Sequence, residues 1–328
     1  MNCPIDEKIY QELRKVLNET EIFCCEKEYL KLYNLGYALL ERVEKGAAYV
    51  NEHIESPSTD EEFFLIMMYG AMLVDAAGLL LKELKIKSPY QKGEQISYCY
   101  FADVCENQNL QFNDGTIPTD KEVWEYIRAL SFAHPFETSR PQFLKKGEIQ
   151  YSPAIIANIK PEFLPVNAEP TIGILVYSTA FHEIKVLNIP YIRILGYISS
   201  RYQLLALGTE RIKQIIAEKK QEWVKQKVEI GANAIDTLKS AISIMENRHE
   251  ETALGDLVLL LEVQSTFEEN RLQICAYQSK IESTIPQIVT FVESLDTDGL
   301  NNYLEQILGQ FTRNYTQTEK RAADNKTG

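Results

Sequence analysis

An arginine and a histidine lie six positions apart in the segment VWEYIRALSFAHPFETSR, residues 123–140. Histidine exchanges protons near neutral pH, and arginine carries a fixed fork of N–H donors that suits phosphate oxygens. Cleavage of RNA without a metal needs such groups, because the 2′-hydroxyl attacks its own phosphate and requires a base, an acid and a cation. Arg128 and His134 are therefore the candidate catalytic pair.

The chain around this pair must bend if both side chains are to meet. On a continuous α-helix, six residues give about 9 Å of rise and roughly 120° of rotation, so the two side chains would point in different directions. His134 directly precedes Pro135, and a residue before proline is pushed out of the α-helical region. We therefore expect the helix to end between Arg128 and His134, which allows both side chains to face one small pocket.

Two basic segments follow the pair and offer contacts to phosphates. The nearer one, SRPQFLKK, contributes Arg140, Lys145 and Lys146, which we expect to bind phosphates next to the scissile one. The second, RIKQIIAEKKQEWVKQK (211–227), has six basic and two acidic residues, with Trp223 available for stacking on a base. A solvated outer helix face is the default interpretation of this second segment, and a basic patch that guides RNA is the alternative.

The stretch RALSFAH resembles the motif of the HEPN superfamily, in which four to six residues separate an arginine from a histidine. An apolar helix with one aspartate, MMYGAMLVDAAGLLLKEL, precedes the motif, as in such bundles. The resemblance implies a helical bundle that acts as a metal-independent endoribonuclease and forms its active site in a homodimer. It also implies a toxin or host-defence role, with a regulatory or antitoxin-like protein as a possible partner.

One position departs from the family pattern. The family often has Asn, Asp or His directly after the arginine, whereas this chain has Ala129. Ser131, Glu137 and Thr138 are the candidate substitutes, and they would orient the histidine or the substrate.

A structural interpretation of the motif stays open. Arg128 can pair with an acid of the bundle, such as Asp75 or Glu125, while His134 caps its helix. The protein would then be a non-catalytic helical scaffold or a partner that senses RNA or a nucleotide. Exposure separates the alternatives, because a catalytic pair faces a cleft and a structural arginine is buried against its acid.

Hydrophobic periodicity predicts a mainly α fold, a helical bundle with a small β insertion. Residues 1–146 form the N-terminal helical bundle that carries the motif, and the Ile- and Val-rich segment 147–190 forms two or three short strands. Residues 191–312 complete the bundle and extend it with C-terminal helices. The tail 313–328 lacks apolar anchors, and we expect it to be disordered.

Charge and cysteine usage restrict the partners and cofactors. The formal net charge of −13 argues against a surface that tracks nucleic acid along its whole length, so any contact with RNA must be local. The six cysteines contain no CxxC pair, and no glycine-rich phosphate loop or zinc-hydrolase histidine pair is present. We therefore predict no metal and no cofactor.

The longest apolar run, Phe63 to Leu81, approaches the length of a membrane span but contains Asp75. We interpret it as a buried central helix and expect no membrane association. The first residues lack the apolar centre of a signal peptide, which favours a cytoplasmic location.

Overall fold

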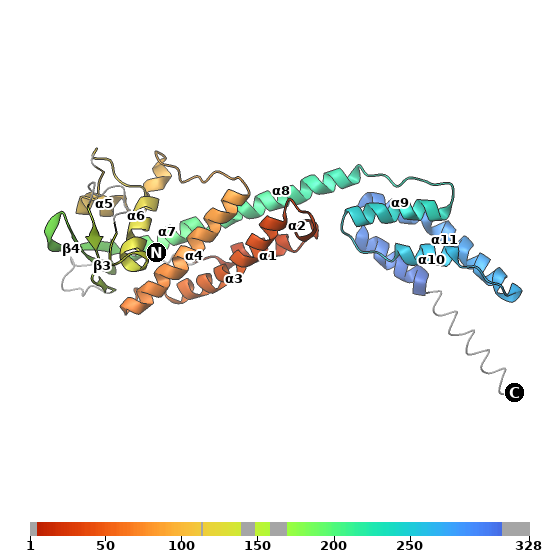
Figure 1. Ribbon diagram of the computed structural model, residues 1–328, viewed down its shortest axis with the longest axis horizontal. Helices are drawn as coiled ribbons and strands as arrows, with labels where there is room; N and C mark the ends of the chain where they lie inside the picture. Colours follow the sequence, from red (N-terminus) through yellow and green to blue (C-terminus); the bar gives the residue numbers. More distant parts are fainter. Residues whose placement is uncertain (1–4, 113, 139–147, 158–168, 310–328) are drawn as a thin grey trace, which may run out of the picture. The chain divides into compact units, whose positions relative to one another are not determined.

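The computed structural model describes residues 5–112, 114–138, 148–157 and 169–309 (Figure 1). It divides into two compact units. Unit 1 comprises Met1–Glu19 and Leu30–Ile212, and unit 2 comprises Thr20–Tyr29 and Lys213–Gly328. The fold is mainly helical with one small antiparallel sheet, which confirms the predicted fold class.

Unit 1 is built around a central helix, α4. Its long helices are α1 (Glu7–Leu17), α3 (Leu30–Glu52), α4 (Asp60–Glu83), α7 (Tyr191–Tyr202) and the first part of α8 (Leu205–Val224). Helix α4 packs against α3 and α7, and α1 packs against α3 (Figure 1). The Thr59 hydroxyl caps the start of α4 by accepting the Glu62 N–H at 3.2 Å. Acidic residues fill the first turn, where their negative charge interacts favourably with the positive end of the helix dipole.

Helix α4 is also long and apolar enough to cross a membrane by length and composition, the one such helix in the described part of the chain. Half of its most apolar window is buried inside the protein. Phe63, Ile66, Leu73 and Leu80 are among its fully buried side chains, as expected for a core helix.

The predicted β insertion is present as a sheet of four strands. These are β1 (Gln150–Tyr151), β2 (Ile155–Ile156), β3 (Thr171–Ser178) and β4 (Phe181–Pro190). Strands β3 and β4 form an antiparallel hairpin, and β1 and β2 pair in succession with the other edge of β3. The Gln108 side chain pairs with the backbone of Asn188 on the free edge of β4, and β4 leads directly into α7.

Unit 2 has a separate apolar core formed by its own helices. They are α2 (Ile22–Cys25), the second part of α8, α9 (Ala234–Asn247), α10 (Leu254–Glu262), α11 (Glu268–Ser294) and helical residues 297–309. Leu238, Leu257, Ile281, Val292 and Leu300 belong to one buried cluster within this unit.

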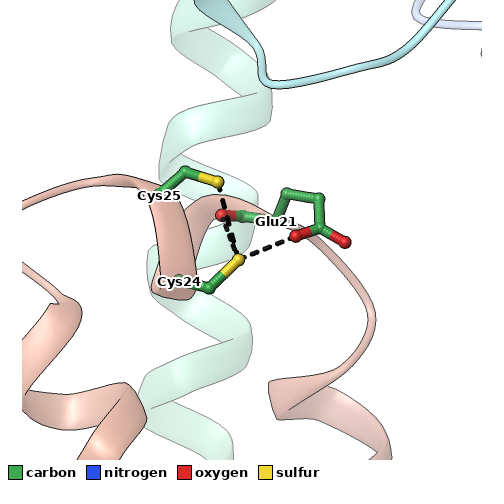
Figure 2. A group of neighbouring side chains, drawn as sticks. All are labelled: Glu21, Cys24 and Cys25. Carbon is green, nitrogen blue, oxygen red and sulfur yellow. Dashed lines mark hydrogen bonds between the residues drawn. The ribbon is translucent and has the colours of Figure 1, made fainter.

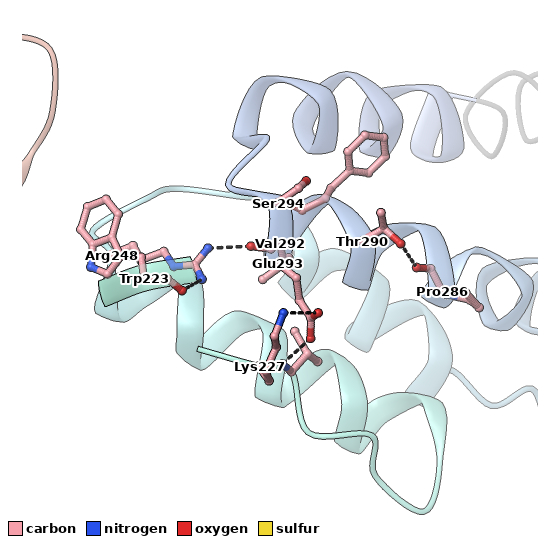
Figure 3. Close-up of polar contacts among 10 residues, drawn as sticks. Trp223, Lys227, Arg248, Pro286, Thr290, Val292, Glu293 and Ser294 are labelled. Atoms are coloured by element: carbon pink, nitrogen blue, oxygen red, sulfur yellow. Dashed lines mark hydrogen bonds and ion pairs between the residues drawn. The ribbon is translucent and has the colours of Figure 1, made fainter. Parts of the chain in front are cut away.

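A buried arginine joins three segments of unit 2 (Figure 3). The guanidinium of Arg248 donates to the Val292 carbonyl at 2.7 Å, to the Trp223 carbonyl at 3.0 Å and to Gln226 Oε1 at 3.0 Å. The two carbonyls belong to the last turns of α11 and α8, where they also accept the N–H groups of Leu295 at 3.4 Å and Gln226 at 3.0 Å. Arg248 therefore fastens the ends of two helices to α9.

The C-terminal helices differ from the sequence expectation in their boundaries. The hydrophobic pattern predicts one helix from Ala253 to about Ile285 and another from Ile285 to Phe311, but α11 continues through Pro286 to Ser294. The Thr290 hydroxyl donates to the Pro286 carbonyl at 2.9 Å within this continuous helix (Figure 3). The break lies instead at residues 263–267, between α10 and α11.

The unit boundary also differs from the expected segments. It falls inside α8, after Ile212, and the sheet region belongs to unit 1 together with the motif. The predicted disordered tail, residues 313–328, lies outside the described residues.

Candidate functional site

The motif helix α6 (Asp120–Arg128) starts with a reciprocal cap. The Glu122 N–H donates to Thr119 Oγ1 at 3.3 Å, and the Thr119 N–H donates to Glu122 Oε2 at 2.8 Å. This capping box satisfies two N–H groups that the first helical turn leaves without partners. It fixes where the helix begins and hence which residues of α6 face the site.

Asp120 ties a neighbouring loop to this helix start. Its fully buried carboxylate accepts the N–H groups of Cys99, Tyr100 and Phe101 at 2.9, 3.0 and 2.9 Å. Burial raises the pKa of Asp120, while the three N–H donors act in the opposite direction. The segment that follows the short helix η1 (Gln95–Tyr98) is thereby held against the N-terminus of α6.

A π-helical turn, η2 (Ala129–Ala133), follows α6 directly and carries the chain from Arg128 to His134. The His134 N–H donates to the Ala129 carbonyl at 2.9 Å, a bond that spans five residues instead of four. The backbone then leaves helical geometry at His134, before Pro135. The helix thus changes its winding after Arg128 and has its last helical residue at Ala133, which confirms the prediction that it ends between Arg128 and His134.

Arg128 and His134 line one cavity of about 500 Å³ in unit 1, which we call the motif cavity. Its other charged and aromatic lining residues are Tyr90, Lys92, Lys121, Glu122, Glu125, Tyr126 and Arg201. A volume of this size is typical of small-molecule and substrate sites. The lining contains four cations and two carboxylates besides the histidine, so the cavity suits an anion.

Arg128 lies between two acids without a short contact to either. Its Nη1 is 3.4 Å from Asp75 Oδ1 on α4 and 3.8 Å from Glu125 Oε1. The Arg128 side chain is 22% exposed and that of Asp75 is 55% exposed, so water screens this pair. Nε of Arg128 is buried without a hydrogen-bond partner among the described residues. The arginine is thus loosely held and retains donor capacity.

His134 is exposed, and its ring has no hydrogen bond to another residue in the described part of the chain. This leaves both ring nitrogens available to a ligand. The imidazole therefore meets the first requirement for proton transfer, which is access to the reacting group.

The predicted supporting residues are not brought to this cavity. Ser131 and Thr138 are buried, their hydroxyls have no hydrogen-bond partner among the described residues, and neither lines the cavity. Glu137 is exposed and also lies outside the lining. None of these three residues takes the place, at the cavity wall, of the polar residue that the family has where this chain has Ala129. Ser131 lies in η2 away from the cavity lining, and Thr138 pairs with Gln150 of the sheet. Arg140, Lys145 and Lys146 lie outside the described residues.

The sequence analysis missed Arg201, Tyr90, Lys92 and Lys121 in the cavity wall. A signal for Arg201 was present, because it is the one charged residue in the last two turns of an otherwise apolar or small-residue helix, ILGYISSRY (194–202). The loop residue Tyr90 carried no comparable pattern.

The second basic segment does not present its tryptophan to RNA. Trp223 is buried, and its carbonyl accepts from Arg248. Lys219 in the same helix lies 2.9 Å from Glu26 Oε2, with Glu28 and Glu222 nearby. Trp223 is therefore not available for stacking on a base, because this part of α8 contributes to the packing of unit 2.

Three potential metal ligands lie together at α2 (Figure 2). Cys24 Sγ donates to Glu21 Oε2 at 2.7 Å and lies 3.6 Å from Cys25 Sγ. The hydrogen bond to Glu21 raises the pKa of Cys24 to about 12. Metal ligation needs the thiolate, which this contact disfavours, so we assign no metal to the cluster.

Comparison with known proteins gives no relative. No protein-family model, no curated protein and no solved structure matches the chain. Function is therefore inferred from the residues of the motif cavity.

Proposed function

We propose that this chain is a metal-independent endoribonuclease, similar to the HEPN ribonucleases, that cleaves RNA by attack of a 2′-hydroxyl on its own phosphate. One observation carries the proposal: the π-helical turn ends at His134, and this histidine lines the same cationic cavity as Arg128. A proton-transfer group and a phosphate-binding group thus share a cavity large enough for part of a nucleotide chain.

The roles follow from the contacts of each side chain. Arg128 binds non-bridging oxygens of the scissile phosphate and stabilises the charge that grows in the transition state. A phosphate provides a stronger partner than Asp75, which lies 3.4 Å away in an exposed pair. His134 removes the proton from the 2′-hydroxyl or delivers one to the leaving 5′-oxygen.

A homodimer would supply the second acid or base. Each chain contributes one His134, whereas the reaction uses a base and an acid. Exposed apolar side chains near the site support such an interface: Leu65 and Leu79 lie on α4 with Asp75, and Phe136, two residues after His134, is 86% exposed. We expect two copies of the chain to associate through this face about a two-fold axis.

The proposed setting follows from the HEPN resemblance. It comprises a cytoplasmic toxin or host-defence role, with RNA as substrate and a regulatory or antitoxin-like protein as a further partner.

A second function, a non-catalytic scaffold or an RNA- or nucleotide-sensing protein, is favoured by the contacts of Arg128 with Asp75 and Glu125. A structural role would place the ion pair in the interior, where its loss is costly. Here both carboxylates are more than half exposed, and the distances exceed those of strong charge-assisted bonds. Exposure therefore supports the catalytic proposal over the scaffold.

The test is RNA cleavage in EDTA by the wild type, Arg128→Ala and His134→Ala, with folding checked by circular dichroism and oligomeric state by size exclusion. We expect cleavage by the wild type and losses of about 10²–10⁴-fold in both variants. His249→Asn is the matched histidine control, because His249 lies in unit 2 with a left-handed φ of 59° that asparagine tolerates. Equal cleavage by folded His134→Ala would exclude the proposal, and marked destabilisation of Arg128→Ala without cleavage by any protein would favour the scaffold.

A further inference from the structure

Arg201 is the most deeply buried cation of the motif cavity. It lies on α7 and is 6% exposed. Its guanidinium carbon lies 3.3 Å from the ring centroid of Tyr90 and 4.5 Å from that of Tyr197. Contacts with two aromatic rings offset part of the cost of removing a guanidinium from water.

These contacts do not neutralise the charge. Among the described residues, no carboxylate lies within 4.0 Å of the Arg201 guanidinium. The nearby acid Asp120 directs its oxygens to three backbone N–H groups. Nη1 of Arg201 donates to Ser200 Oγ at 3.0 Å, while Nη2 is buried without a hydrogen-bond partner in the described part of the chain. A buried cation in this state is costly unless a countercharge arrives.

The cavity is the place from which that countercharge can come. Arg201 and Arg128 both line it, and each has a buried guanidinium nitrogen without a partner. Lys92 lies 3.5 Å from Glu122 and is thereby partly compensated, whereas the exposed Lys121 has no carboxylate within ion-pair distance among the described residues. Arg128 is likewise partly compensated by Asp75 at 3.4 Å and Glu125 at 3.8 Å. The uncompensated charge is therefore concentrated on Arg201 and Lys121.

We propose that Arg201 forms, with Lys121 and next to Arg128, a phosphate subsite for the backbone of single-stranded RNA. Arg201 supplies the buried charge, Lys121 contributes from the exposed side, and the phosphate held here flanks the scissile one. This inference rests on the proposed function, because it identifies the bound phosphate as a neighbour of the scissile one. Phosphate is the chemistry that fits, because guanidinium groups and lysine bind its oxygens and the site offers more than one cation.

The experiment measures fluorescence anisotropy of a labelled single-stranded 2′-deoxyoligonucleotide with the full chain, at low and at high salt. We expect binding that weakens with salt, about tenfold weaker binding by Arg201→Gln and about threefold weaker binding by Lys121→Gln. Arg193→Gln is the matched control, since Arg193 lies on the same helix, pairs with Asp103 at 2.8 Å and does not line the cavity. Its affinity should equal that of the wild type.

Several results would overturn the inference. These are the absence of binding by the wild type, and wild-type affinity in folded Arg201→Gln. If Arg201→Gln does not fold, wild-type affinity in Lys121→Gln would also overturn the inference. Competition distinguishes a nucleic acid from a free nucleotide or phosphate ion as the ligand. If AMP or inorganic phosphate displaces the labelled oligonucleotide as effectively as unlabelled oligonucleotide does, the ligand is the free nucleotide or ion and not a nucleic acid.

Failure of this inference is distinguishable from failure of the proposed function. A deoxy chain lacks the 2′-hydroxyl and cannot be cleaved by the proposed reaction, so its binding reports on the subsite alone. Intact deoxyoligonucleotide binding together with absent RNA cleavage would reject the nuclease and keep the subsite. RNA cleavage that Arg201→Gln does not change would keep the nuclease and reject the subsite.

Discussion

Two buried arginines, one in each unit, differ in how their guanidinium groups are satisfied. Arg248 in unit 2 is 1% exposed and donates to two carbonyls and one side-chain amide oxygen. Arg201 in unit 1 is 6% exposed, donates to one hydroxyl and has an unpartnered Nη2 beside a cavity. Neither has a carboxylate within ion-pair distance among the described residues.

This difference separates a structural role from a binding role. Burial lowers the pKa of Arg248, and its donors are used to connect the ends of two helices to α9. Arg201 has no comparable set of acceptors, so its surroundings are completed only when an anion enters. Burial alone does not distinguish the two arginines, whereas the satisfaction of their donors does.

The largest expected effect is the loss of Arg248. Arg248→Met removes three hydrogen bonds, to the carbonyls of Val292 and Trp223 and to Gln226 Oε1, and each of them contributes about 1 kcal/mol. We expect unit 2 to lose about 3 kcal/mol of stability. Urea unfolding with hydrogen–deuterium exchange read separately for peptides of the two units measures this. An unchanged unit 2 would refute the structural role of Arg248.

A smaller loss is expected when the wall beside Arg201 is overpacked. A Cβ at Gly196 on α7 would lie 2.7 and 2.9 Å from ring atoms of Tyr100, and a ring held by its neighbours cannot easily move. Gly196→Ala should destabilise unit 1 by about 1–3 kcal/mol and weaken oligonucleotide binding. Gly78→Ala on α4 is the control: its Cβ would meet no atom within 4 Å, so the substitution should stabilise the helix by about 0.5–1 kcal/mol. Equal stability of the two variants would contradict the packing.

Loss of the Arg201 charge should change stability little. Arg201→Gln removes the two ring contacts but also removes a desolvated charge, so we expect the free energy of unfolding to stay within about 1 kcal/mol of the wild-type value. Thermal unfolding with added phosphate provides a second measurement, in which the wild type should gain stability and the variant should not. A loss of stability in Arg201→Gln as large as that in Arg248→Met would contradict the separation of a binding role for Arg201 from a structural role for Arg248.

The smallest effect concerns a surface contact of unit 2 (Figure 3). Glu293 accepts from Lys227 Nζ at 3.0 Å and from the Val228 N–H at 3.1 Å, and these contacts lower the pKa of Glu293 below its ordinary 4.5. Its contribution is therefore present above pH 4.5 and is lost as the pH falls through the lowered pKa in the folded state. Glu293→Gln should lose about 0.5 kcal/mol at neutral pH and become equal to the wild type in acid. Urea midpoints across that range test this, and a difference that grows in acid would reverse the sign.

Local patterns predicted much of the fold. The restriction before Pro135 and the Ile- and Val-rich strands are short-range signals, and each gave the correct element. The π-helical turn was not predictable, because no residue type in ALSFA signals a five-residue bond and the contact of η2 with α4 is not local in sequence. Arg201 joined the cavity through α7, about 70 residues after Arg128, and a contact over that separation leaves no periodic pattern in the sequence.

The most direct test of the central proposal uses two oligonucleotides that differ in one oxygen. The first is an RNA that the wild type cleaves in EDTA, and the second has a single 2′-deoxy nucleotide at the mapped scissile position. The account predicts 2′,3′-cyclic phosphate and 5′-hydroxyl ends from the first, and no cleavage of the second at that position. Cleavage of the deoxy substrate at the same position and rate would contradict attack by the 2′-hydroxyl, and with it the roles proposed for Arg128 and His134.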